Sequence, residues 1–301
     1  MSSRRLPAVA LLLVLCGSTG ALSLADLPSP AATLTVDPNL PHDCERGDYS
    51  ASKRMCSGVD GRAFRSLQSA IDAAKPGDTV RIRAGVYKQG AGPTILLVKR
   101  SGTPDAPIRI EAYGDGPVEL RGRGFEDQDR DGDGRADGPA SSGDRSALVV
   151  IAADHVHLRG LDVGLSSYRG LILQGSDNRI EETVVHDSWM GNVSVGSGSR
   201  NNVLRFVESR NARHGGGIGL GPAAKDLREL RGNRIERCLS HHNGRLPDGS
   251  LVLPIRGDPA GGGNSDGAGT SKTCAAAAGA NLCVGVAFVE DRVIARCNAR
   301  L

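Results

Sequence analysis

Four aspartates at alternate positions in the segment DQDRDGDGRAD, residues 127–137, form the most specific chemical pattern in the sequence. Ca²⁺ prefers many oxygen ligands at flexible distances, and alternating carboxylates around a glycine turn supply them. We therefore predict a structural calcium loop inside an insertion over residues 127–138, with a solvated acidic loop as the alternative. The candidate ligands are Asp127, Asp129, Asp131, Asp133 and Asp137.

A second segment, GGGNSDGAGTSKTC at residues 261–274, has the glycine content of a phosphate loop. Such a loop needs glycine directly before its lysine and again five residues earlier, so that backbone N–H groups can surround the phosphates. Ser271 and Asp266 occupy those positions, and a carboxylate would repel a polyphosphate. A nucleotide site is therefore excluded. The segment is either a glycine-rich turn in which Asp266 caps a bend, or part of a site for another ligand.

Several histidines and carboxylates fall near the ends of predicted strands. We interpret His186, His214 and the pair His241–His242 as solvated turn residues. A glycoside hydrolase would need two carboxylates at a fixed separation. Such a pair would have to come from Asp162, Asp187 and Glu208, but no local spacing selects two of them.

The N-terminal residues have the order of a secretory signal: two arginines, an apolar run at 8–15 and then small residues. We assign residues 1–25 as a signal peptide and predict a secreted protein, extracellular or periplasmic. Cys16 would permit a lipoprotein, but Leu15 is bulky where lipid attachment requires a small residue. No other apolar run is long enough to span a bilayer.

Charge and cysteine content narrow the classes of partner. The net charge of +3 falls to about +1 without Arg4 and Arg5, and aromatic residues make up 3% of the chain, so we expect no nucleic-acid partner. Six cysteines remain after the signal peptide, and an even number in an exported chain favours disulfides over metal thiolates. The pairs close in sequence are Cys44 with Cys56 and Cys274 with Cys283.

The elements that must position these residues are short. Apolar residues recur at helical spacing over Phe64–Ala74, and the turn Lys75–Asp78 ends that helix. Alternating strand-like runs follow, TVRIRAGVY from residue 79, PIRIEAYG from 107 and PVELRG from 117.

Short runs then recur with a common register, and this repetition determines the predicted fold. One set begins at residues 170, 192, 217 and 267, and a second begins at 155, 178, 202, 233 and 290. The first spacings are about 22 to 24 residues, which is typical of a solenoid of short strands. In the first set the inward candidates are Leu171, Leu173, Val193, Val195, Ile218, Leu220, Ala268 and Thr270.

We therefore predict an all-β fold, a right-handed parallel β-helix over residues 61–301, with the helix capping its N-terminal end. Residues 26–60 are an extended lead-in. Asn178, Asn202 and Asn233 lie at turns, where asparagine adopts left-handed conformations and hydrogen-bonds along a stack. Cys238 and Cys297 occupy equivalent positions on successive coils, as an interior thiol stack or a disulfide.

The capping helix, the runs PGDTVRIRAGVY and PIRIEAYG, and the later NSDG resemble the family 9 polysaccharide lyases and related pectate-lyase-like β-helices. The resemblance implies that Asp266 is a ligand of a site calcium and that Lys272 lies near the family's lysine. It implies β-elimination on a uronate polymer, an acidic polysaccharide, with calcium as cofactor. Lys272 is the candidate base, and Lys272 and Arg256 are the candidate substrate contacts.

In that family further calcium ligands lie on the next coil, in an Asp-Asp-Gly-type turn, and the base lies beyond that coil. This sequence ends at Leu301, where the next coil would begin. We therefore expect missing C-terminal coils, an inactive lyase in this form, and a monomer when complete, with no membrane partner. The alternative is a non-catalytic β-helix that binds glycans or cell-surface material.

Overall fold

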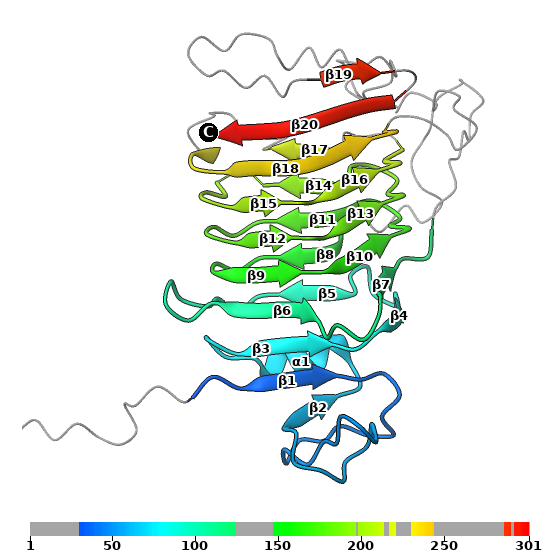
Figure 1. Ribbon diagram of the computed structural model, residues 1–301, viewed down its shortest axis with the longest axis vertical. Helices are drawn as coiled ribbons and strands as arrows, with labels where there is room; N and C mark the ends of the chain where they lie inside the picture. The colour runs from blue at the N-terminus through cyan, green and yellow to red at the C-terminus, as the bar shows by residue number, and fades with distance from the viewer. Residues whose placement is uncertain are drawn as a thin grey trace, which may run out of the picture. The chain divides into compact units, whose positions relative to one another are not determined.

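Parallel strands arranged in three stacks form the framework of the part of the protein that the structure describes (Figure 1). The computed structural model describes residues 30–124, 147–196, 198–213, 217–220 and 230–243, together with the backbone of the strands at 286–289 and 292–300. Among these residues, no helix has the length and hydropathy needed to cross a bilayer.

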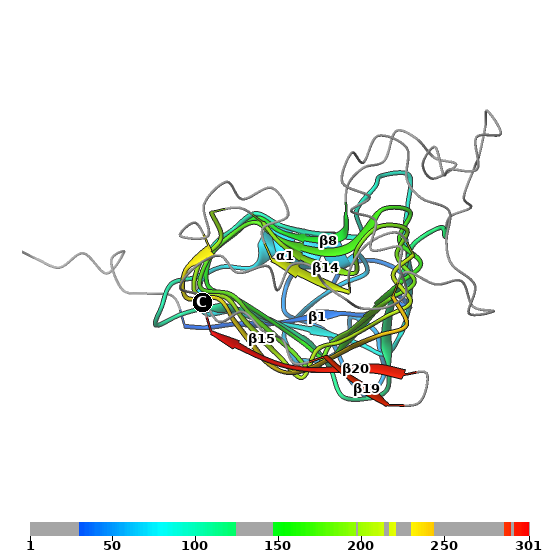
Figure 2. The same ribbon diagram turned by 90° about the horizontal axis from the view of Figure 1, so that it is seen from above.

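A complete coil contributes one strand to each of three stacks, which surround a common core. Figure 2 shows β8 and β14 of the third stack on one side of this core, and β1 and β15 of the first stack on the other. The first stack contains β2 (Arg62–Phe64), β1 (Thr33–Val36), β3 (Thr79–Ile82), β6 (Ile108–Ala112), β9 (Val156–Arg159), β12 (Arg179–Glu181), β15 (Val203–Arg205) and the first half of β18 (Arg234–His241). The second contains β4 (Gly85–Lys88), β7 (Val118–Arg121), β10 (Leu161–Gly164), β13 (Val184–His186), β16 (Glu208–Arg210) and the second half of β18. The third contains β5 (Leu96–Val98), β8 (Ala147–Ile151), β11 (Arg169–Leu173), β14 (Val193–Val195) and β17 (Ile218–Leu220).

The core consists of rows of aliphatic residues that run along the solenoid. In the first stack, parallel pairing places each inward residue directly against its counterpart on the next coil. This row contains Ile110, Leu158, Ile180, Leu204 and Ile235, all less than 5% exposed. The predicted inward residues Leu171, Leu173, Val193 and Val195 are likewise buried in the third stack. Each coil has too little apolar surface to form a core alone, so stacking creates it.

A short helix covers the first coil, as predicted, but it is shorter than expected. α1 spans Leu67–Ala73, begins at the N-cap Ser66 and packs against β1, β2, β3 and β5. Its Gln68 side chain donates to Leu97 O and accepts from Leu97 N, both at 2.9 Å. An amide side chain thus satisfies the edge of β5 where no earlier strand is present, and this edge is protected from further pairing.

An asparagine ladder connects the coils at the turn that precedes the first stack. The backbone N–H of Asn178 donates to Asn202 Oδ1, and that of Asn202 donates to Asn233 Oδ1, each at 2.9 Å. All three side chains are buried. The predicted stack is confirmed, but the left-handed residue is the one before each asparagine: Asp177, Asn201 and Gly232, with φ of 58°, 55° and 82°.

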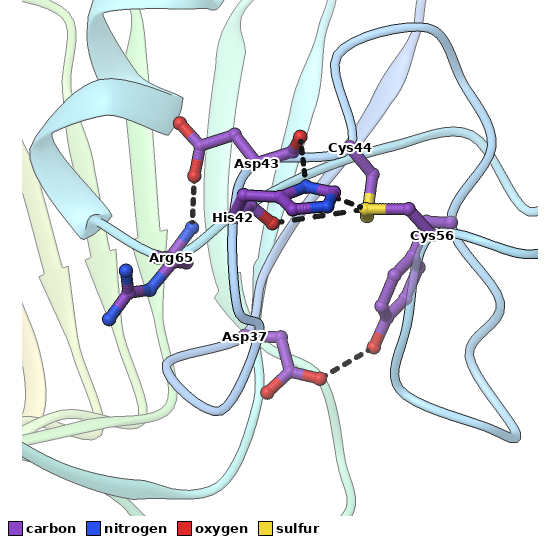
Figure 3. Close-up of a disulfide and its surroundings, with 7 residues drawn as sticks. Asp37, His42, Asp43, Cys44, Cys56 and Arg65 are labelled. Atoms are coloured by element: carbon purple, nitrogen blue, oxygen red, sulfur yellow. Dashed lines mark hydrogen bonds between the residues drawn. A yellow bond between two sulfur atoms is a disulfide. The ribbon is translucent and has the colours of Figure 1, made fainter.

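The described part of residues 26–60, the segment expected to be an extended lead-in, contributes the strand β1 to the first stack. It also forms a loop that is closed by a disulfide. β1 pairs with both β2 and β3. The predicted disulfide Cys44–Cys56 is present and closes the loop that follows (Figure 3). Asp37, at the end of β1, accepts hydrogen bonds from Tyr49 at 2.8 Å and from Arg54 Nε at 2.9 Å. Burial acts to raise the pKa of Asp37, but these donors outweigh it, so its pKa is lowered and the carboxylate anchors the loop.

The strand at the C-terminal end differs from the prediction in direction. The run from residue 290 forms β20 (Arg292–Arg300), but β20 pairs antiparallel with β18 and with β19 (Val286–Val289), not as a further parallel coil. Cys238 and Cys297 do lie opposite each other, in antiparallel register. Cys238 is a free and buried thiol. Cys274 and Cys283, the other pair that is close in sequence, lie outside the described residues.

We predict that Asn202→Ala destabilises the solenoid more than an exposed change at the adjacent turn position. The substitution removes the acceptor of Asn178 N–H and the donor to Gly175 O, both buried. Unfolding in urea should show a loss of about 2–4 kcal/mol, since each unsatisfied buried group costs about 1–3 kcal/mol. Asn201→Gly is the control, because Asn201 is exposed and glycine keeps the left-handed backbone. Equal losses in the two variants would contradict a role for the ladder.

Candidate functional site

Charged side chains are concentrated on the outer face of the second stack, towards the C-terminal ends of its strands. Parallel register aligns Arg121 of β7, Gly164 of β10, His186 of β13, Arg210 of β16 and His241 of β18 in one column. The column two residues earlier on each strand carries Glu119, Asp162 and Glu208. Cationic and anionic groups therefore face each other across the same short strands.

His186 is the centre of this arrangement. Its Nε2 lies 2.8 Å from Asp162 Oδ1, and its Nδ1 lies 2.5 Å from Asp187 Oδ2. Arg121 Nη1 contacts the same Asp162 Oδ1 at 2.5 Å, and Arg121 Nη2 contacts Glu119 at 3.0 Å. We call Arg121, Asp162, His186 and Asp187 the His186 cluster.

A glycine on the neighbouring coil makes room for the imidazole ring. A Cβ atom at Gly164 would lie 2.5 Å from His186 Cε1, closer than nonbonded carbon atoms approach. Gly164 has no left-handed requirement, so its role here is steric. The position of the ring therefore depends on a residue 22 positions earlier in the chain.

Electrostatics favour the charged form of His186. Burial alone would lower its pKa, but the hydrogen bonds and charges of Asp162 and Asp187 outweigh this, so the pKa of His186 is raised. With both ring nitrogens directed at carboxylates, the doubly protonated ring satisfies both contacts. The prediction of a solvated turn histidine is wrong for His186, which is 8% exposed.

The two carboxylates respond in the opposite sense. Burial acts to raise the pKa of Asp162, but His186 and Arg121 outweigh it and its pKa is lowered. The hydrogen bond from His186 lowers the pKa of Asp187. The cluster thus favours ionised carboxylates and a protonated histidine, whereas the general acid of a glycoside hydrolase needs a carboxyl group whose pKa is raised.

The charged column continues onto the next two coils. Glu208 accepts from Arg210 Nη1 at 3.1 Å and lies 3.3 Å from His241 Nε2. His241 and His242 contact each other through their Nδ1 atoms at 2.6 Å. His241 lies half-buried at the end of β18. His214 lies outside the described residues.

The site residues predicted from sequence lie outside the part of the chain that the structure describes. These are Arg256, Asp266 and Lys272 and the aspartates of the predicted calcium loop, Asp127, Asp129, Asp131, Asp133 and Asp137. Their roles stay predictions. Arg256, Asp266 and Lys272 belong to the segment that follows Asn243, two residues after His241 at the end of β18.

The described residues hold a single group with metal-ligand spacing, and its chemistry does not fit calcium. It consists of Cys44, Asp48 and Cys56, and the two sulfurs are joined in the disulfide. Calcium requires several oxygen ligands, which this group lacks. Within the described ranges the site calcium expected from the resemblance therefore has no ligand set.

Sequence reasoning missed the His186 cluster for a physical reason. Its members come from three coils, and each belongs to a run that reads as an ordinary strand. One signal was available: aligning the coils places Gly164 directly before His186 in the column. A single small residue between large polar ones marks a position where a neighbouring side chain lies over the backbone.

These features define the class of protein: a parallel β-helix with an internal asparagine ladder and a charged column on one outer face. A family described as Pel9A-like, right-handed beta helix region, matches residues 50–249, about two thirds of the sequence. The chain belongs to this Pel9A-like family, and the predicted right-handed parallel β-helix is confirmed.

Two known proteins give the scale of the similarity. Pectate lyase PEL9 of Emericella nidulans is 25% identical over 173 residues, which cover 56% of this chain and 40% of that protein. The crystal structure of pectate lyase Pel9A matches with a TM-score of 0.50 and 20% identity, covering 70% of this chain and 48% of the other. The chain thus spans less than half the length of either relative in the matched region.

We predict that His186 contributes stability with a definite pH window. A folded pKa above the unfolded value gives a contribution that is complete below about pH 6.5 and is lost as pH rises through the folded pKa. Asp162 and Asp187, with lowered pKa, contribute above about pH 4 and lose this as pH falls through their folded pKa values. His186→Gln should therefore lower the unfolding free energy by about 2 kcal/mol near pH 6.

The measurement is urea unfolding of both proteins from pH 5 to pH 9, with the difference expected to shrink as pH rises. His42→Gln serves as the control, because His42 is exposed beside the disulfide and away from the cluster. A His186 effect that is constant over this range would show that packing, not charge, explains it.

Proposed function

We propose that this chain is the β-helix of a secreted, calcium-dependent polysaccharide lyase that cleaves a uronate polymer by β-elimination. Membership of the Pel9A-like family and the similarity to a curated pectate lyase support the reaction class. The observation that carries the proposal is the charged column through Arg121, His186 and Arg210 on the outer face of the second stack.

This column gives the β-helix a fixed charge pattern on its surface. Arg121 is 18% exposed and His186 is 11% exposed at the side chain, so both are held rigidly while one edge stays accessible. Asp162 and Asp187 hold the histidine in its charged form. In the proposal this face orients a uronate chain along the stack, because preorganised groups lose little entropy on binding.

Calcium would be held by residues outside the described ranges. Asp266 offers carboxylate oxygen, which is the donor that calcium prefers. When bound, the ion would offset repulsion between protein and substrate carboxylates and acidify the proton next to the substrate carboxylate. In the proposal Lys272 takes that proton, and Arg256 contacts the substrate carboxylate.

One observation favours a second function, a β-helix that binds acidic glycans without cleaving them. Both nitrogens of His186 face carboxylates, and the lowered pKa values of Asp162 and Asp187 make these carboxylates weak bases. In this case the cluster would bind the glycan and no residue would remove a proton.

We predict calcium-dependent release of unsaturated product from polygalacturonate, measured by its ultraviolet absorbance. Lys272→Met should reduce the rate at least about 100-fold, because general base catalysis contributes about 10²–10⁴-fold. Asp266→Asn should reduce the rate at low calcium concentration, because it removes the proposed carboxylate ligand of the ion. Asp258→Asn, in the same segment but outside the NSDG motif, is the control. Binding without product would support the second function, and full activity of Lys272→Met would contradict its role as the base.

We also predict that calcium raises the thermal unfolding midpoint through the Asp-rich loop. Calcium at about 100 times its dissociation constant would stabilise the folded protein by about 2.7 kcal/mol. The double variant Asp129→Asn, Asp131→Asn should lose this stabilisation, while Asp266→Asn should retain most of it. An unchanged midpoint in the parent protein would exclude a structural calcium loop.

A further inference from the structure

A second cationic column lies on the outer face of the first stack. Parallel register places Arg109 of β6 against His157 of β9, and His157 against Arg179 of β12. Successive strands are about 4.8 Å apart, so the three side chains form a line along the solenoid. Both arginines are exposed, and His157 is half-buried between them. We call these three residues the Arg109–Arg179 column.

The neighbouring column on the same strands has a different charge pattern. There, register alternates basic and acidic residues from coil to coil. Arg81 pairs with Glu111 of this column at 3.1 Å. Arg159 pairs with Glu182, the residue directly after the column position Glu181, at 2.8 Å. The complete alternating set is Arg81, Glu111, Arg159, Glu181, Arg205 and Glu236.

The Arg109–Arg179 column lacks such compensation. Across the described part of the chain, neither Arg109 nor Arg179 forms an ion pair or a side-chain hydrogen bond. Opposite charges on adjacent strands stabilise a sheet, and neither arginine has one in this column, since the residue between them, His157, is neutral near pH 7. Among its described residues, the protein therefore bears two arginines without ion-pair partners in one column while it neutralises the column beside it.

We propose that the Arg109–Arg179 column is a binding surface for an acidic polysaccharide, with the carboxylates of the glycan lying along the solenoid over these three residues. The surface is separate from the His186 cluster, which lies on the second stack. The identity of the polyanion rests on the proposed function, whereas the anion-binding surface itself does not.

The width of the column favours a thin, regularly charged chain. The carboxylates of Glu111 and Glu181 lie on the same strands, two residues from Arg109 and Arg179. A broad anionic surface such as a bilayer would meet these acids together with the arginines. A single glycan strand aligned with the column contacts the arginines alone. The column also carries no tryptophan, tyrosine or phenylalanine on which nucleic-acid bases would stack.

His157 reports on the charge at this surface. Burial lowers its pKa to about 4, and the nearby charges of Arg179, Arg109 and His155 add to the effect. The other charged groups on the packed strands are Glu111 of β6, Arg159 of β9 and Glu181 of β12. A bound carboxylate would offset the two arginines and favour the imidazolium, so binding raises the pKa and should strengthen as pH falls from 7 to 5.

The test is an NMR titration of His157 in the full chain with polygalacturonate, with EDTA present so that calcium-dependent cleavage is stopped. We expect the pKa of His157 to rise from about 4 towards its ordinary value near 6.5. The double variant Arg109→Gln, Arg179→Gln should lose the response to the polymer. Both substitutions are on exposed side chains, and circular dichroism confirms that the variant is folded.

Lys75→Gln is the matched control, since it removes one exposed positive charge from the turn after α1. It should respond to the polymer as the parent protein does. An unchanged His157 pKa with polygalacturonate, or an equal rise in the double variant, would overturn the proposal. An equal rise with duplex DNA or with phosphatidylserine vesicles would overturn the assignment to an acidic glycan.

The outcome is separable from that of the proposed lyase activity. A His157 response without any unsaturated product would support this surface and count against the lyase. Product formation without a His157 response would support the lyase and count against this binding surface.

Discussion

Parallel stacking in exact register is the constraint on which the rest of this structure depends. Each residue of a coil lies against its counterpart about 4.8 Å away on the next coil, so any property of one position is repeated along the solenoid. Inward positions become aliphatic rows such as the one through Ile110, Leu158 and Ile180. A buried polar side chain must find its hydrogen-bond partners along the same direction. The ladder of Asn178, Asn202 and Asn233 does so, because each side chain accepts from the backbone of the coil before it.

The same constraint governs the charges on the outer faces. A charged residue in a column has a neighbour within one strand spacing on both sides, so it must be compensated or it raises the energy of the fold. The second stack compensates Arg121 and His186 with Asp162, taken from the adjacent column. The first stack compensates one column by alternation, and in the Arg109–Arg179 column beside it two arginines flank the neutral His157 without an opposite charge. These two arginines are therefore charges in this stack for which the described part of the fold gives no partner.

The fold could be predicted from the sequence because its rule is periodic and local, whereas the candidate site is neither. The spacing of the runs and the inward pairs such as Leu171 and Leu173 were sufficient for the β-helix. The prediction placed the left-handed turn residue one position late. Asparagine suits both a left-handed turn and a hydrogen-bonded ladder, and only the backbone angles show which of these two roles a position has. The direction of β20 was missed because a strand reads the same way in parallel and antiparallel pairing. His186 was missed because its surroundings come from Asp162 and Gly164, on another coil.

Two histidines with the same intrinsic chemistry show how far the columns, and not the residue type, determine charge. His186 faces carboxylates on two sides and its pKa is raised, while burial and two flanking arginines lower that of His157 to about 4. Between about pH 5 and 6.5 the first is charged and the second neutral. The positive charge of the second stack is then already balanced within the protein, whereas that of the first stack is open to an external anion. A solenoid can carry both states at once because its buried rows maintain the fold and leave its outer columns free to differ.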